Sequence, residues 1–145
     1  MRTTFKMLSR ALFGIFRDHK LTAAMDEKQF FDPSHANRVH VFHGTFVFEL
    51  AATSYCFDAP SRNEPEPLTR DLPDAMIDTT EVEIIFGTAR IGGAVPMLTQ
   101  YTENLFNEIG SDNTLVLIAE AAFCGLPYSM NDTPMLRYAG AFDVL

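Results

Sequence analysis

Apolar residues near the N-terminus recur at spacings of three and four, the period of an α-helix. Phe5, Leu8, Leu12 and the pair Ile15 and Phe16 follow this spacing, and basic residues occupy other positions around the predicted helix. The pattern predicts an amphipathic helix over residues 3–18.

Alternating positions over residues 39–54 predict a strand. Even-numbered positions there are mostly bulky and apolar, whereas odd-numbered positions include His43, Thr45 and Glu49. We expect one long strand, or two strands bent at Gly44, with one face toward a core. Residues 81–86 and 114–121 predict two further strands, and residues 135–145 predict an edge strand.

A second helix is predicted over residues 94–109, with Pro96 in its first turn and Gly110 as its C-terminal cap. Residues 58–80 contain four prolines and predict a long loop. The order of elements predicts an α+β fold in a single globular domain spanning 1–145. Its antiparallel or mixed sheet would carry about two helices, packed mainly on one face.

The length of 145 residues and a hydrophobic content of 47% suit one globular core. No uninterrupted apolar run is long enough for a transmembrane segment, and the N-terminal segment lacks the features of a secretory signal. We therefore expect a soluble, intracellular protein, with organelle targeting by the N-terminal helix left open. Cys56 and Cys124 lie among apolar residues and predict two buried thiols, with a single disulfide as the alternative.

Charge is distributed unevenly along the chain. Residues 1–20 carry five basic and one acidic side chain, whereas the whole chain has a net charge of −8. The remaining residues therefore carry a net charge of −12. Such an acidic body repels phosphate backbones, so we expect no nucleic-acid partner. The distribution describes a basic arm on an acidic body.

A glycine-rich segment, residues 87–93, separates a predicted strand from a predicted helix. Backbone amides at a helix start can bind a phosphate or carboxylate, and Arg90 could pair with the same anion. The candidate ligand-binding residues are Gly87, Arg90, Gly92 and Gly93, and the ligand would be a small anion. The alternative is a strand-to-helix connection that needs glycine only for its backbone angles.

A polar face on the predicted sheet is a second candidate site. His43, Thr45 and Glu49 could share this face with glutamates at positions 81, 83 and 120. A histidine among carboxylates suits acid–base chemistry, because neighbouring negative charges keep a proton available near neutral pH. If the protein is an enzyme, the candidate catalytic residues are Glu83, Glu120, Glu49 and His43. The alternative is a solvated outer face of the sheet.

The histidines do not form a recognisable metal-binding pattern. His40 and His43 are three residues apart on a predicted strand, so their side chains should point to opposite faces. We expect no metal and no cofactor.

The N-terminal helix is the predicted interaction element. Its apolar arc, widened by Met7 and Phe13, is broader than one packing stripe. It could bind a protein partner, a second copy, or an anionic membrane surface as a peripheral contact, or it could pack on its own sheet. The candidate interaction residues are Phe5, Leu8, Arg10, Leu12, Phe13, Phe16 and Arg17.

Together these features favour a non-catalytic interaction or assembly subunit that docks through this helix. The alternative is a small enzyme or an anion-binding protein with its site at residues 87–93.

Overall fold

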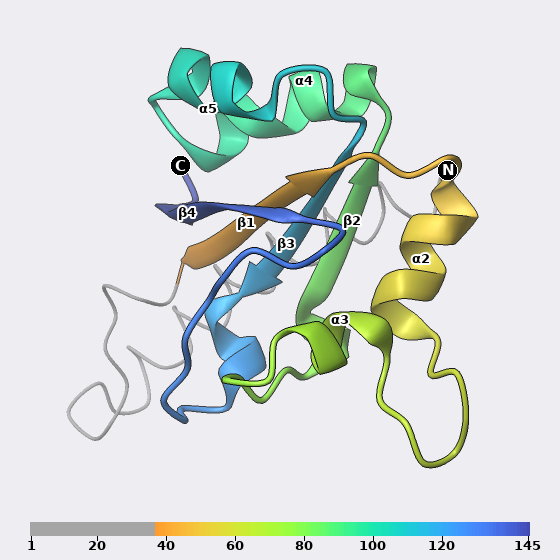
Figure 1. Ribbon diagram of the computed structural model, residues 1–145. Helices are drawn as coiled ribbons and strands as arrows, with labels where there is room; N and C mark the ends of the chain where they lie inside the picture. The colour runs from red at the N-terminus through yellow and green to blue at the C-terminus, as the bar shows by residue number, and fades with distance from the viewer. Residues whose placement is uncertain (1–36) are drawn as a thin grey trace, which may run out of the picture.

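The computed structural model describes residues 37–145. Four strands form one sheet in the order β2-β3-β1-β4, and every neighbouring pair is antiparallel (Figure 1). They are β1 (Arg38–Gly44), β2 (Val82–Phe86), β3 (Thr114–Ala119) and β4 (Arg137–Asp143). The α+β class and the antiparallel sheet are therefore confirmed. The helix predicted over residues 3–18 lies outside the described residues.

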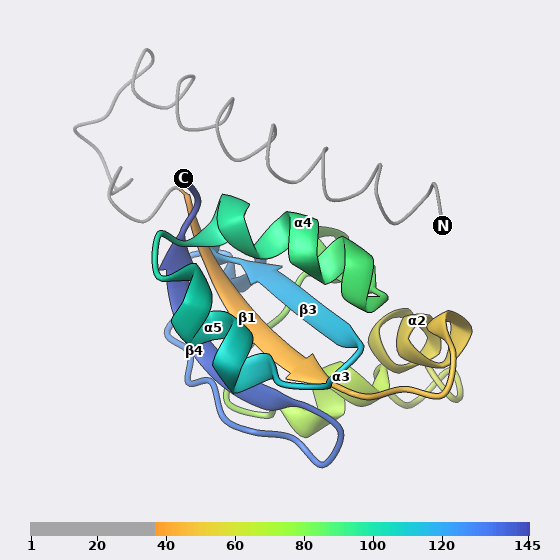
Figure 2. The ribbon, with the colours of Figure 1, turned by 90° about the horizontal axis from the view of Figure 1, so that it is seen from above.

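Helices cover both faces of the sheet (Figures 1 and 2). The helices α4 (Thr88–Leu98) and α5 (Thr102–Ile109) pack on one face, in the region where the sequence predicted one helix over residues 94–109. The helices α2 (Glu49–Phe57) and α3 (Pro67–Asp71) pack on the other face, and they come from residues predicted as strand and loop. The 3-10 helices η2 (Thr79–Glu81) and η3 (Glu120–Phe123) flank β2 and β3.

Alternation along each strand divides the core into two apolar layers. Val39 and Val41 of β1 face α4 and α5, whereas Phe42 faces α2 and α3. The sheet is buried on both sides because helices cover both. Any polar side chain on these strands must therefore find a partner inside the protein.

The strand predicted over residues 39–54 ends at Gly44, and its second half is the helix α2. Ala52, Tyr55 and Cys56 are buried at spacings of three and one, which place them on one side of a helix. Glu49 lies in the first helical turn, where a negative charge suits the helix dipole. The prediction of a continued or paired strand is wrong because the apolar alternation there coincides with a helical stripe.

The single helix predicted over residues 94–109 is two helices, and the first begins earlier, at Thr88. Thr99 separates them in an extended conformation, and its hydroxyl accepts a hydrogen bond from the Tyr101 amide at 2.9 Å. The Thr102 hydroxyl donates to the Thr99 carbonyl at 3.0 Å. These local bonds replace the helical ones and allow the chain to bend over the sheet.

Residues 58–80 contain more structure than the predicted loop. Pro67 begins α3, at the helix position where a missing backbone N–H costs nothing. Cys56 is buried as predicted, but Cys124 is exposed, and both thiols are free. None of the helices described between residues 37 and 145 has the length and apolarity needed to cross a membrane.

Candidate functional site

Strand β1 projects His40 and His43 to opposite faces of the sheet, as the sequence spacing predicts. The exposed fraction is 3% for His40 and 2% for His43, so each imidazole lies in the interior with its own polar neighbours. Titratable side chains meet around each of these two buried histidines.

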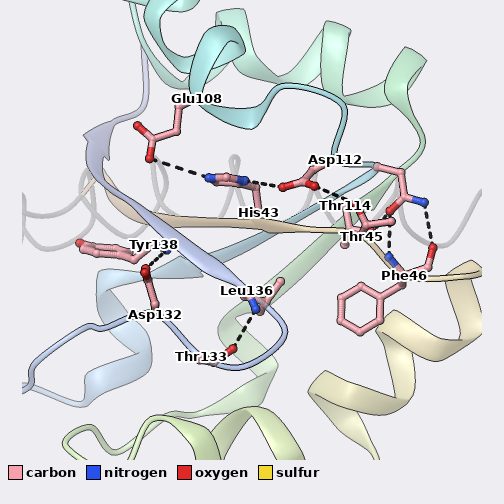
Figure 3. A network of polar contacts seen from close by, with 11 residues as sticks. His43, Thr45, Phe46, Glu108, Asp112, Thr114, Asp132, Thr133, Leu136 and Tyr138 are labelled. Atoms are coloured by element: carbon pink, nitrogen blue, oxygen red, sulfur yellow. Dashed lines mark hydrogen bonds and ion pairs between the residues drawn. The ribbon is translucent and has the colours of Figure 1, made fainter.

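His43 is held by Asp112, in the connection from α5 to β3 (Figure 3). His43 Nδ1 lies 2.7 Å from Asp112 Oδ2, and the Thr45 hydroxyl donates to Asp112 Oδ1 at 2.7 Å. Since Asp112 uses both oxygens as acceptors, the His43 proton must sit on Nδ1. This leaves Nε2 as the potential base in the neutral imidazole.

His43 Nε2 faces the carboxylate of Glu108 on α5. The distance from Nε2 to Glu108 Oε2 is 3.8 Å, and among residues 37–145 Nε2 has no hydrogen-bond partner. A carboxylate–imidazole pair with a bare Nε2 is the arrangement of a general base. However, this nitrogen has almost no accessible surface, so a substrate cannot reach it in this conformation.

The neighbours of Asp112 stabilise its ionised form. Burial favours the neutral acid, but hydrogen bonds from His43 and Thr45 outweigh it, together with electrostatic interactions with His43 and Arg137. These interactions hold the pKa of the Asp112 carboxyl below its usual range. The next residue, Asn113, accepts a bond from the Phe46 amide at 3.1 Å and donates to the Phe46 carbonyl at 2.8 Å. The loop after β1 is thereby fixed to the start of β3.

His40 lies in a closed network on the opposite face. Its Nδ1 is 2.8 Å from the Tyr138 hydroxyl, and its Nε2 is 3.0 Å from both Glu120 Oε1 and the Tyr128 hydroxyl. The Tyr128 hydroxyl lies 2.8 Å from each Glu120 oxygen. The rings of Phe123 and Tyr128 stack beside it, with centroids 3.8 Å apart. Both nitrogens of His40 are therefore engaged.

Burial controls the protonation of this second cluster. Desolvation lowers the pKa of His40 more than the hydrogen bond and charge of Glu120 raise it. Desolvation, with the nearby Glu120, also raises the pKa of Tyr128 to about 12 and shifts the pKa of Tyr138 upward. A neutral histidine between un-ionised phenols is a structural network rather than an activated nucleophile.

The polar face predicted from the sequence is divided between these places. Glu83 is buried on β2, in register with Leu117, on the face that His43 also occupies. Glu120 lies with His40 on the other face, and Glu49 is in α2 rather than on a strand. One set containing all four candidate residues does not form, because helix α2 and the strand alternation separate them.

Most of the turn predicted over residues 87–93 is helix in the structure. Only Gly87 precedes the helix, at a φ of 103° that suits glycine, whereas Arg90, Gly92 and Gly93 belong to α4. The amides of Gly92 and Gly93 lie beyond the first turn, so they are not among the free amides of the helix start. Gly92 and Gly93 therefore do not line the helix start, and the anion site predicted over residues 87–93 stays a prediction.

Sequence reasoning missed several members of the two clusters: Glu108, Asp112, Tyr128 and Tyr138. Asp112 belongs to a turn signal before the third strand, a position that gave no hint of a histidine partner. The interaction residues predicted between positions 5 and 17 lie outside the described residues. Within 37–145, no group of three or more histidine, cysteine or acidic side chains is arranged to hold a metal ion.

Comparisons with known proteins add no family to this picture. No family model, curated protein or solved structure matches the chain. The functional argument therefore depends on the geometry and charges described above.

Proposed function

We propose that this protein is a non-catalytic assembly subunit that associates with a second copy through its cationic N-terminal segment, residues 1–20. The observation that carries the proposal is the opposition of charge within one chain. Residues 1–20 have a net charge of +4, whereas residues 37–145 contain five basic and fifteen acidic side chains. Two copies can pair these opposite charges reciprocally.

The state of the two histidines supports a non-catalytic role. Both nitrogens of His40 are within hydrogen-bond distance of Glu120, Tyr128 or Tyr138. The remaining nitrogen of His43 is buried beneath Glu108. General-base catalysis requires a nitrogen within reach of a substrate proton, and neither imidazole meets that requirement in this conformation.

Sedimentation velocity on the full chain tests the proposal. Arg10→Glu combined with Arg17→Glu reverses the charge of the segment and should convert a dimer to a monomer. Raising the salt concentration from about 0.05 to 0.5 M should weaken the wild-type dimer, because exposed charges are screened. Arg62→Glu, in an exposed part of the described loop, is the control and should leave the dimer intact.

A wild-type chain that sediments as a monomer at every concentration would overturn the proposal. So would a dimer that survives the charge reversal of the segment. Either result would favour the alternative, a ligand-binding role for the acidic body of the chain.

A further inference from the structure

We infer that the outer face of α4 is the surface that receives the N-terminal segment of a second copy; this rests on the self-association proposed above. The outer face consists of the exposed residues of the helix, which are Thr88, Ala89, Gly92, Gly93, Pro96 and Met97. None of these side chains is charged.

The neighbouring helix α5 shows what an ordinary solvent face looks like in this protein. Its exposed residues are Glu103, Asn104, Asn107 and Glu108, all polar or charged. Both helices pack on the same face of the sheet (Figure 2). Arg90 is the charged residue of α4, and it is half-buried rather than part of the outer face. The absence of charge from that outer face is therefore a property of the helix rather than of its side of the molecule.

The residues on the outer face of α4 lower the stability of the helix if that face contacts only water. Gly92 and Gly93 each destabilise a helix interior by about 1 kcal/mol relative to alanine, and Pro96 removes a helical hydrogen bond. A Cβ at either glycine would meet no described atom within 4 Å, so packing inside residues 37–145 does not require glycine there. A second helix lying close against α4 would explain residues without bulky side chains at positions 89, 92, 93 and 96.

Apolar surface extends the outer face of α4 at its C-terminal end. Met97 is 45% exposed and the C-terminal residue Leu145 is 62% exposed. The two are adjacent, because the Leu145 amide donates to the Met97 carbonyl at 3.0 Å. Together they lengthen an uncharged surface that suits the apolar arc of an amphipathic helix.

The described chain also begins beside this surface. The Asn37 carbonyl accepts from the Val144 amide at 2.8 Å, one residue from the contact between Leu145 and Met97. Residues 19–36 can span up to about 60 Å when extended, and the helix predicted over residues 3–18 would be about 24 Å long. The segment can therefore reach the α4 of a neighbouring molecule without strain.

The width of the apolar arc favours a second copy over the segment's own body. Met7 and Phe13 extend the arc beyond one packing stripe, so a single contact with α4 would leave apolar surface in water. In a symmetric dimer each segment would lie on the partner's α4, and the two segments would shelter each other's remaining apolar residues.

A pair of matched variants of the full chain tests this surface. Gly92→Lys places an ammonium group in the outer face of α4 and should raise the dimer dissociation constant about tenfold or more, because the added charge would be buried on association next to a segment of the same sign. Asn104→Lys adds the same group at an exposed position of α5 and should change that constant by less than about twofold. Circular dichroism of each variant checks that the fold is retained. Gly93→Ala, which a free helix tolerates, provides a second measurement, and it should also weaken the dimer.

Mixing distinguishes an exchanged segment from one that lies on its own body. The Gly92→Lys chain keeps a normal segment, and the chain carrying Arg10→Glu with Arg17→Glu keeps a normal α4. Each should be monomeric alone, and the mixture should form heterodimers through the one intact pairing. No heterodimer on mixing would overturn the inference. If charge reversal of the segment dissociates the dimer while Gly92→Lys and Gly93→Ala do not, self-association stands and the α4 surface is wrong.

Discussion

His43 Nδ1 lies 2.7 Å from Asp112 Oδ2, and this short bond joins strand β1 to the loop that precedes β3. The same carboxylate accepts a hydrogen bond from the Thr45 hydroxyl, so one aspartate fixes both the end of β1 and the loop after it. The bond explains how a histidine is accommodated among the apolar side chains beneath α5.

Asp112→Asn should lower the free energy of unfolding by about 1–2 kcal/mol at neutral pH, because an amide cannot accept from both His43 and Thr45 as a carboxylate does. Urea denaturation measures this change. The pKa of Asp112 is lowered in the folded state, so its stabilisation is present above the usual carboxyl value of about 3.9 and is lost as the pH falls through the folded pKa. The wild type and the variant should therefore converge in acid. A difference that grows on acidification would contradict this account.

The buried His40 should make the folded state sensitive to mild acid. Its pKa is lowered by burial, so the stability contributed by the neutral imidazole is present above the usual value of about 6.5 and is lost as the pH falls toward the folded pKa. His40→Gln does not titrate in this range. The stability gap between wild type and variant, measured by urea denaturation, should narrow from about pH 7.5 to about pH 5. A gap that stays constant would show that His40 is not buried as a neutral group.

Tyr138→Phe removes the hydroxyl that lies 2.8 Å from His40 Nδ1. The imidazole nitrogen would remain buried without this hydrogen-bond partner, and the free energy of unfolding should fall by about 1–2 kcal/mol. Tyr101→Phe is the matched control, since Tyr101 is 64% exposed and the change should be within about 0.5 kcal/mol. Equal effects of the two substitutions would exclude a stabilising role for the His40 network.

Gly44 is the last residue of β1, and its backbone lies close to residues 135 and 136, just before β4 begins. A Cβ at this position would collide with the Met135 carbonyl oxygen and approach Leu136 Cδ2 at 3.0 Å. Gly44→Ala should therefore cost about 2 kcal/mol, because the backbone at 135 cannot move aside easily. Gly92→Ala should have the opposite sign in dilute protein, where the monomer dominates, and should raise stability by up to about 1 kcal/mol. Thermal unfolding of both variants provides the comparison, and a neutral Gly44→Ala would contradict the close packing.

Local periodicity predicted the elements in which the pattern of apolar residues fits only one kind of secondary structure. The strands 81–86 and 114–121 match β2 and β3 closely, and the edge strand within 135–145 is β4. The opposite directions of His40 and His43 also follow from strand geometry alone. By contrast, residues 49–57 satisfied an alternating pattern and a helical one, and only burial of Ala52 and Cys56 against the sheet decided between them.

The candidate sites were harder to predict because they depend on distant partners. Asp112 is 69 positions from His43, and Tyr138 is 98 positions from His40. No spacing rule relates such residues, so the sequence placed Glu83 and Glu120 on one face that the fold divides in two.

The sequence by itself determined the α+β class, the positions of β2, β3 and β4, and the charge division between residues 1–20 and the acidic body. These are local or additive properties, which short-range periodicity and a count of side chains express directly. Tertiary structure decided the helical state of residues 49–57 and the partners of both histidines, because each depends on which surfaces the folded sheet brings into contact.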